Sequence, residues 1–197
     1  MNVSRETRAD LEEFADQLLH WSRSINLVSC HDHSQVWTRH IEDSLQITQF
    51  VAQCASWLDF GSGGGFPALP LAIWAKHHQP GVTFTLVESD ARKSTFLRQM
   101  IRLFDLQASV MTSRIEHIEA LQYDVISARA LADLPTLLAY ADPHVHADST
   151  AIFPKGRRFQ EEIDEARRHW RFDVDAVQSL TDKEARILVI KNLERRK

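Results

Sequence analysis

The sequence is short of cysteine, of long apolar runs, and of glycine outside one segment. It has 197 residues, with only two cysteines and six glycines. Cys30 and Cys54 cannot form the disulfide framework of a small secreted protein, so they favour a reducing compartment. The longest apolar stretch, residues 68–75, contains a proline and is far shorter than the roughly 20 residues that span a bilayer. The charged first twenty residues hold no apolar signal core, so we expect a cytoplasmic protein without a membrane segment.

Neither sign of charge is in large excess. The formal net charge is −4, with 44% hydrophobic and 25% charged residues, which is typical of a globular protein and excludes disordered and fibrous classes. The slight acidity argues against a protein that coats polyanions indiscriminately, but local basic clusters still permit a specific nucleic-acid contact. The clearest clusters are Arg92, Lys93, Arg98 and Arg102, and Arg157, Arg158, Arg167, Arg168 and Arg171. Ordinary solvated helix faces are the alternative explanation for each.

The pattern of apolar residues divides the chain near residue 54. Residues 1–54 predict helices alone, separated by a polar loop at residues 29–34. Their two apolar stripes are Leu11, Phe14, Ala15, Leu18, Ser22 and Ile25, then Trp37, Ile41, Leu45, Thr48 and Val51. We therefore expect an N-terminal helical extension, 1–54, packed on a larger domain, 55–197.

The larger domain alternates strands with helices. Strands are predicted at residues 57–60, 82–87, 108–111, 123–127, 150–153, 172–177 and 186–191, and helices after Pro67 and at residues 91–104, 133–141 and 159–170. Such alternation predicts an α/β fold with a mostly parallel sheet covered on both faces. The last two strands have no helix between them, so we expect them to pair as an antiparallel hairpin.

Four of the six glycines lie within residues 61–65, directly after the first predicted strand. Asp59, Gly61, Gly63 and Gly65 give the pattern D-x-G-x-G-x-G. A dinucleotide fingerprint, G-x-G-x-x-G, fails because its third glycine position is Phe66. Glycines at this place let the backbone approach a ligand at the carboxyl end of the strand.

The acidic residue at the strand tip discriminates between ligands. Asp59 would repel a pyrophosphate, whereas it would attract a ligand that carries an ammonium and a sulfonium, such as S-adenosylmethionine. Glu88, which ends the second strand, can accept both hydroxyls of a ribose. After the third strand, the backbone around Ile115 and Glu116 is placed to contact an adenine. An ordinary helix cap at Ser113 is the alternative there.

Several segments, taken in order, resemble the bacterial 16S ribosomal RNA guanine-N7 methyltransferases, also called the glucose-inhibited division protein B family. The matching segments are Asn26-Leu27-Val28-Ser29, Arg39-His40-Ile41-Glu42-Asp43-Ser44-Leu45, the loop from Asp59 to Pro67 with Leu69-Pro70-Leu71-Ala72, Glu88-Ser89-Asp90-Ala91-Arg92-Lys93 with Phe96-Leu97-Arg98, Ser127-Ala128-Arg129-Ala130 and Lys155-Gly156. The resemblance covers nearly the whole chain. One departure is Ala68, where the family usually has glycine.

The resemblance implies a Rossmann-like class I methyltransferase fold with a seven-stranded sheet. It implies methyl transfer from S-adenosyl-L-methionine to N7 of one guanine, 527 in the usual rRNA numbering, in 16S RNA of the small subunit, with S-adenosyl-L-homocysteine as product. We expect a monomer that needs no metal. The expected cofactor residues are Asp59, Gly61, Ser62, Gly63, Gly65, Phe66, Glu88, Ile115, Glu116 and Arg129, and the expected RNA contacts are Arg92, Lys93, Arg98 and Lys155.

Guanine N7 carries a lone pair in the base plane and has no proton to lose. No general base is therefore required, and catalysis should come from holding the reactants in line, which is worth roughly 7–11 kcal/mol. We expect Ser127 and Arg129 to position the base, with a structural ion pair as the alternative for Arg129. His40 and Asp43 share a helix face but lack a third metal ligand, so a helix-to-domain hydrogen bond is the better interpretation for His40, with lining of the cofactor pocket as the alternative.

Three other functions stay open at this point. The first is a methyltransferase that acts on another RNA, a protein or a small molecule. The second is an NAD-dependent dehydrogenase, which the missing third glycine and Asp59 argue against. The third is an RNA-binding module that keeps the fold without catalysis.

Overall fold

The computed structural model describes residues 3–29, 32–51 and 53–196. Cys30 and part of the predicted 29–34 loop lie outside the described residues. Within them, no helix is both long enough and apolar enough to cross a membrane.

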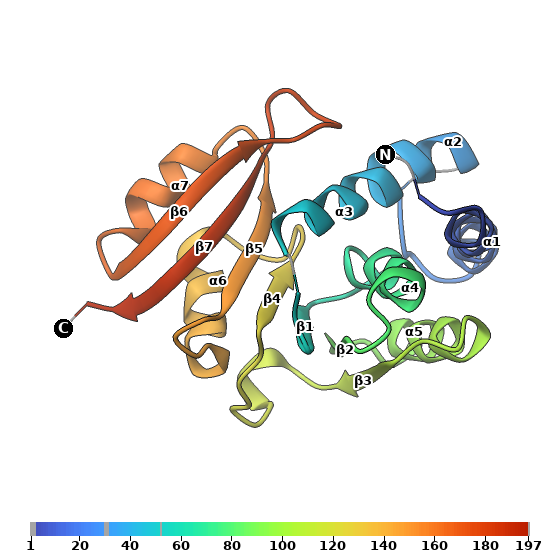
Figure 1. Ribbon diagram of the computed structural model, residues 1–197, viewed down its shortest axis with the longest axis horizontal. Helices are drawn as coiled ribbons and strands as arrows, with labels where there is room; N and C mark the ends of the chain where they lie inside the picture. Colours follow the sequence, from blue (N-terminus) through green and yellow to red (C-terminus); the bar gives the residue numbers. More distant parts are fainter. Residues whose placement is uncertain (1–2, 30–31, 52, 197) are drawn as a thin grey trace.

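Seven strands form one sheet in the order β3-β2-β1-β4-β5-β7-β6 (Figure 1). They are β1 (Ser56–Phe60), β2 (Thr83–Glu88), β3 (Ala108–Thr112), β4 (Val125–Ala128), β5 (Thr150–Lys155), β6 (Trp170–Gln178) and β7 (Arg186–Arg195). Strands β1 to β5 pair in parallel, and β7 runs antiparallel to both β5 and β6. The predicted seven-stranded sheet with its C-terminal hairpin is confirmed.

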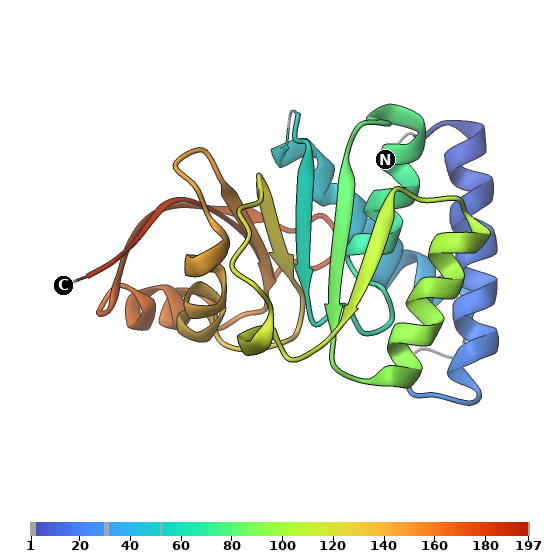
Figure 2. The ribbon, with the colours of Figure 1, turned by 90° about the horizontal axis from the view of Figure 1, so that it is seen from below.

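The helices cover the two faces of the sheet. They are α1 (Arg5–Ser22), α2 (His33–Val36), α3 (Asp43–Leu45), α4 (Ala68–His78), α5 (Ala91–Leu103), α6 (Leu134–Ala141) and α7 (Phe159–Ala166). Figure 2 shows α4 and α5 on one side of the strands with α1 outside them, and α6 and α7 on the other side. Both faces of the central parallel strands β1 and β4 are therefore shielded from water, as parallel strands require, whereas alternate residues of the edge strand β6 are exposed.

Alternate residues of each strand enter one of two hydrophobic cores. Trp57 and Phe84 point to the core that α1, α4 and α5 cover. Leu58 and Phe60 point to the core that α6 and α7 cover. The period of two follows from the pleat of a strand, and it assigns Asp59, which lies between Leu58 and Phe60, to the α4 face.

The N-terminal extension shares the first of these cores. Leu11, Phe14 and Leu18 of α1 are fully buried in the same cluster as residues of α4 and α5. The Phe14 ring packs edge-on against Phe66 of the glycine loop at 5.6 Å between ring centroids, and against Phe104 at 6.4 Å. The change of pattern at residue 54 is therefore a change in secondary structure, and the hydrophobic core continues across it.

Two predicted helices differ from the structure. The second N-terminal stripe is not one α-helix, because a π-helical segment, Trp37–Glu42, lies between α2 and α3, and α2 begins within the predicted loop, capped by Asp32. The predicted helix 159–170 ends at Ala166. Trp170 instead begins β6, where its buried side chain completes the second core.

We expect Phe14→Ala to lower the free energy of unfolding by about 3–5 kcal/mol, because it leaves a cavity between α1, the glycine loop and Phe104. Urea denaturation with an unchanged m-value would measure the loss. Leu121→Ala removes a side chain that is 44% exposed and should change stability by less than about 0.5 kcal/mol. Equal effects of the two substitutions would contradict a shared core.

Candidate active site

The candidate site lies at the carboxyl edge of the parallel strands. Strand β1 is flanked by β2 on one side and β4 on the other, so the winding of the chain reverses there. In open α/β sheets, ligands bind in the crevice outside the strand ends at such a reversal. The loops that follow β1, β2, β3 and β4 all start at this edge and carry the predicted cofactor and base-contacting residues.

The glycine loop adopts backbone conformations that favour glycine. Gly61, Gly63 and Gly65 have φ values of 62°, 51° and 90°. A Cβ at Gly65 would overlap the Leu69 side chain, and one at Gly61 would lie 2.7 Å from Leu131 Cδ1. At Gly63 an added Cβ would have only the Gly61 carbonyl nearby, at 3.7 Å, so the loop is open on that side. Ala68 follows in the first turn of α4 and is fully buried, so its methyl group is accommodated.

Asp59 is buried rather than open at the strand tip, which corrects our expectation of a carboxylate facing the ligand directly. Its exposure is 0%, and it accepts hydrogen bonds of 2.6 Å from the hydroxyls of Ser62 and Ser127. Burial raises the pKa of Asp59 from 3.8 to about 7, against the opposing effect of the two hydroxyls.

Ser127 is likewise fully enclosed in this network. Its hydroxyl donates to Asp59 and accepts from Trp57 Nε1 at 2.9 Å, and its exposure is 0%. The hydroxyl is thus engaged within the protein, so its geometry fits support of Asp59 better than the direct contact with a base that we predicted.

Glu88 ties the glycine loop to the end of β2. It is 8% exposed, and its two carboxylate oxygens accept from the backbone N–H groups of Gly63 at 2.9 Å and Asp90 at 2.8 Å. Each carboxylate oxygen has a second lone pair. Glu88 can therefore hold the loop and still accept hydroxyl groups of a ligand.

The segment after β3 forms a short 3₁₀ turn, Ile115–His117. Glu116 accepts a hydrogen bond of 3.0 Å from the Tyr140 hydroxyl. The cap at Ser113 that was the alternative explanation is not formed, because Arg114 is the capping residue and the Ser113 hydroxyl donates to the Arg114 carbonyl. The turn lies next to Glu88, since Ser113 N–H donates to the Glu88 carbonyl at 3.2 Å.

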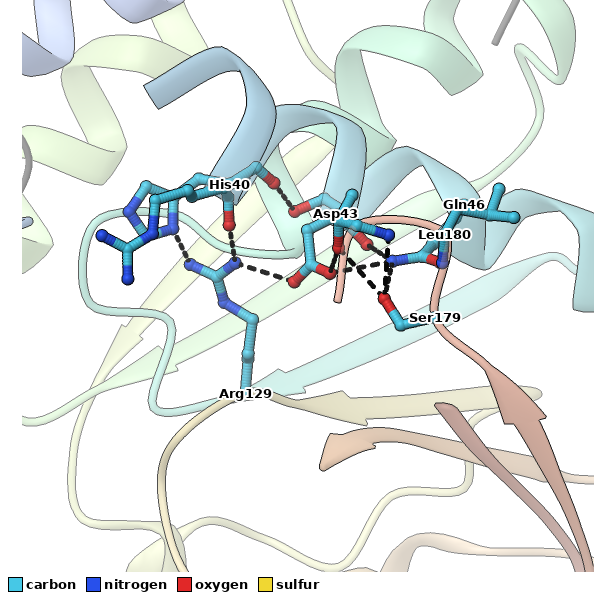
Figure 3. A network of polar contacts seen from close by, with 9 residues as sticks. His40, Asp43, Gln46, Arg129, Ser179 and Leu180 are labelled. Atoms are coloured by element: carbon cyan, nitrogen blue, oxygen red, sulfur yellow. Dashed lines mark hydrogen bonds and ion pairs between the residues drawn. The ribbon is translucent and has the colours of Figure 1, made fainter. Parts of the chain in front are cut away.

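Arg129 extends from the end of β4 to the N-terminal helices (Figure 3). Its guanidinium donates to the Arg39 carbonyl at 3.3 Å, to Asp43 Oδ2 at 3.2 Å and to His40 Nδ1. It also lies over the Phe66 ring, at 4.9 Å from Cζ to the ring centroid. The structural ion pair that we considered for Arg129 is present, and the helix-to-domain hydrogen bond expected of His40 is confirmed.

His40 is held in its neutral form by this arrangement. Burial and then the charge of Arg129 lower the pKa of His40 from 6.5 to about 4. Because a guanidinium only donates, the Nδ1 atom of His40 must accept, and the neutral ring carries its proton on Nε2. The ring also stacks on Phe66 at 4.9 Å between centroids.

A pocket of about 660 Å³ opens beside Arg129. Its walls come from the N-terminal helices, the loop after β4, the end of β5 and the β6–β7 turn. Ala130 has a φ of 53°, which is uncommon for a residue with a side chain and is often found at functional sites. A larger hollow of about 900 Å³, around Cys54 and Asp124, lies at the opposite edge of the sheet and contains none of the predicted site residues.

The four predicted RNA contacts differ in their availability. Lys155 is 9% exposed, pairs with Glu162 at 2.7 Å and lines the pocket beside Arg129, so its ammonium is engaged within the protein rather than free at the surface. Arg98 donates to the Val110 carbonyl and, at 2.6 Å, to Thr112 Oγ1. The Arg92 side chain is 75% exposed, and Lys93 is half-buried on the same helix. Of the predicted contacts, Arg92 and Arg98 are both exposed.

The site also contains residues that sequence reasoning did not assign to it. Thr181 and Gln46 bond to Asp43, and Leu131 covers Gly61. Of this group, only Asp43 could have been found from the sequence, because it lies within the Arg39–Leu45 segment that matches the family. Among residues 3–29, 32–51 and 53–196, no three His, Cys, Asp or Glu side chains are grouped to hold a metal ion.

We expect Asp59→Asn to stabilise the protein increasingly as the pH rises. The pKa of Asp59 is raised, so its stabilising contribution is complete below pH 3.8 and is lost as the pH rises through about 7. The variant does not ionise, so its unfolding free energy relative to wild type should increase by up to about 4 kcal/mol between pH 4 and pH 8. Urea denaturation at several pH values would measure this difference.

Asp124→Asn is the matched control, with the opposite sign. The pKa of Asp124 is lowered, first by the Ala55 backbone N–H and also by that of Ser56. Its contribution is therefore present above pH 3.8 and is lost as the pH falls below that value. Asp124→Asn should destabilise the protein at pH 7 and have less effect at pH 3.5. The same pH trend in both variants would contradict the assignment for Asp59.

Comparison with solved structures identifies the fold. The chain superposes on an O-methyltransferase from Bacillus cereus, in complex with SAH, with a TM-score of 0.62 and 15% identity, covering 91% of each chain. It superposes on a ribosomal protein L11 methylase from Lactobacillus delbrueckii subsp. bulgaricus with a TM-score of 0.61 and 17% identity, covering 84% of this chain and 80% of that one. At these identities the likeness establishes the fold alone.

Comparison with sequences is more specific. The family model for rRNA small subunit methyltransferase G matches residues 7–190. Ribosomal RNA small subunit methyltransferase G of Ruegeria pomeroyi is 45% identical, covering 99% of this chain and 96% of that protein. The protein of the same name from Methylobacterium sp. is 44% identical, covering 97% and 91%. These matches confirm the resemblance found in the sequence: the chain belongs to the GidB family, the rRNA small subunit methyltransferases G.

Proposed function

We propose that the protein transfers a methyl group from S-adenosyl-L-methionine to N7 of a guanine, position 527 in the usual numbering, in 16S RNA of the small ribosomal subunit. One observation carries the proposal. In a chain of this family, a glycine loop, the acidic strand end at Glu88 and the pocket beside Arg129 all lie at the same edge of the sheet.

The residues at the sheet edge fit S-adenosyl-L-methionine. The open side of the loop at Gly63 leaves room for the methionine part, next to Gly61, Ser62, Gly65 and Phe66. Glu88 has lone pairs left for the two ribose hydroxyls, and the Ile115–His117 turn next to it would border the adenine. The bound cofactor supplies an electrophilic methyl group on a positively charged sulfur.

Asp59 acts in this proposal as a charge beneath the loop, not as an open contact. It accepts from Ser62, so it fixes the loop from below. With its pKa raised to about 7, Asp59 is partly protonated at neutral pH in the absence of a ligand. A positively charged ligand above Ser62 would favour the ionised carboxylate, so cofactor binding should release part of a proton near pH 7.

The pocket of about 660 Å³ beside Arg129 would receive the target guanine. The proposed acceptor, N7, has no proton to remove, so the described residues need only align the base and exclude water. Arg129, which lines this pocket, would contact guanine O6 or a neighbouring phosphate through its guanidinium. The exposed Arg92 and the half-buried Lys93 are proposed to approach the RNA backbone.

The proposed substrate, the small ribosomal subunit, also bears on where the protein acts and whether it acts as a monomer. A ribosomal substrate places the protein in the cytoplasm. The glycine loop, Glu88 and Arg129 all come from one chain, which supports action as a monomer.

The proposal is tested by incubating the protein with labelled methyl donor and small subunits that lack the modification, and then mapping the labelled nucleotide. We expect one labelled guanine, with the label at N7. Naked 16S RNA, bulk protein and small molecules supplied in parallel would reveal another acceptor. Binding to subunits without any transfer would instead favour a non-catalytic RNA-binding module, and tight NAD binding without a response to S-adenosylhomocysteine would favour a dehydrogenase.

We expect Glu88→Ala to weaken S-adenosylhomocysteine binding by about 10- to 100-fold, because hydrogen bonds to a charged group are worth about 1.5–3 kcal/mol. Isothermal titration calorimetry would measure the change. Affinity for the small subunit should stay within about threefold of wild type, since Glu88 bonds Gly63 and Asp90 away from the Arg129 pocket. Parallel losses in both assays would contradict this division of roles.

A further inference from the structure

One carboxylate, that of Asp43, joins three separate parts of the chain (Figure 3). Its Oδ2 atom accepts from Arg129 Nη1 at 3.2 Å, across 86 positions of sequence. Its Oδ1 atom accepts from the Thr181 hydroxyl at 2.7 Å, across 138 positions. Asp43 itself lies at the start of α3, directly after the π-helical segment that carries Arg39 and His40.

Both distant partners line the same pocket. Arg129 belongs to its inner wall, after β4, and Thr181 belongs to the β6–β7 turn that forms its outer wall. Asp43 lines the pocket between them. The side chains of Arg129 and Asp43 are only 17% and 18% exposed, so solvent screens their attraction less than it screens a surface pair.

A buried glutamine strengthens the link to the turn. Gln46 is fully buried, and its amide group donates to Asp43 Oδ1 at 2.8 Å and to the Ser179 hydroxyl at 3.2 Å. Its carbonyl oxygen accepts from Leu180 N–H at 2.8 Å. The backbone of the turn is therefore held from the N-terminal helix, although the Leu180 side chain is 74% exposed.

The anchored turn presents groups that suit an RNA strand. Lys183 is exposed next to the pocket, and Arg186 lines it from the start of β7. Leu180, on the same turn, offers an exposed apolar surface against which a base can pack. The turn therefore combines an apolar tip with charges of both signs, because Lys183 lies between the exposed Asp182 and Glu184. Its position relative to Arg129 is set through Asp43.

We propose that Asp43 is a positioning residue that holds the Arg129 guanidinium and the β6–β7 turn at the spacing the target nucleotide requires, and so governs RNA recognition rather than cofactor binding. This inference rests on the proposed function. The contacts of Asp43 lead to the two walls of the pocket, whereas the ligand-facing contacts of Glu88 lead to the glycine loop. Loosening the turn should therefore affect the RNA step alone.

The most direct test uses Thr181. Thr181→Val keeps the shape of the side chain and removes the hydroxyl, which donates to Asp43 and also contacts the Ser179 hydroxyl at 3.0 Å, while Thr181→Ser keeps the hydroxyl. We expect Thr181→Val to raise KM for unmodified small subunits by about 10- to 100-fold, the value of one hydrogen bond to a charged acceptor. Both kcat and the affinity for S-adenosylhomocysteine should stay within about twofold of wild type, and Thr181→Ser should restore KM.

Thr83→Val is the matched control. Thr83 is exposed at the amino end of β2, and its hydroxyl donates to the Ala55 carbonyl at 3.1 Å, at the opposite edge of the sheet. It should leave KM and kcat unchanged.

A second test is Asp43→Asn, which removes the charge from both links and should raise KM further. In Asp43→Asn the added Thr181→Val change should raise KM by a smaller factor than it does in wild type, since Asn keeps an acceptor oxygen but not the charge.

The outcomes separate this inference from the proposed function. No methyl transfer to small subunits by wild type would overturn the proposed function and the inference with it. Transfer by wild type with an unchanged KM in Thr181→Val would overturn the inference alone. The inference would also be overturned if the affinity for S-adenosylhomocysteine fell by the same factor by which KM rose. Additive effects of Asp43→Asn and Thr181→Val would overturn it too, because either result points to general disruption of the fold.

Discussion

The reversal of winding at β1 is the constraint on which the site depends. Parallel strands place all their carboxyl ends at one edge, and β1 lies between strands whose connections leave in opposite directions. The first loop, residues 61–67, must therefore turn sharply in the open crevice, which is why three of its glycines have positive φ. Asp59 closes the underside of this loop by accepting from Ser62 and from Ser127 of the neighbouring β4, so one buried carboxyl joins the loop to both central strands.

Local pattern was sufficient to predict the sheet, the glycine loop and the acidic end of β2. These features depend on residues close together in sequence: the period of two in strands, glycines where the chain turns, and Glu88 at a strand end. The C-terminal hairpin was predicted for the same reason, since no helix separates β6 from β7. The π-helical segment Trp37–Glu42 was not, because its apolar spacing does not distinguish it from an α-helix.

The burial and the bonding partners of individual charged groups could not be predicted, because they depend on residues that are distant in sequence. Lys155 resembles a free surface cation until the fold brings it against Glu162 and the Ala132 carbonyl. Asp59 was expected to face the ligand, but Ser127, 68 positions away, helps to enclose it. Arg129 and His40 are 89 positions apart. In each case the residue type was noticed in the sequence, and the tertiary contact decides what that residue can do.

Methylation at guanine N7 makes the exact placement of each residue important for the proposed function. A reaction with no proton to remove gives the protein little chemistry beyond alignment, so small errors of position are costly. The N-terminal segment packs directly on the glycine loop: Phe14 and His40 contact Phe66, and an added Cβ at Gly64 would lie 3.0 Å from the Leu27 carbonyl. Asp43 then bonds to Arg129 at the other side of the site. The extension thus contacts both the glycine loop and the pocket beside Arg129, so under the proposed function it would help to align cofactor and base.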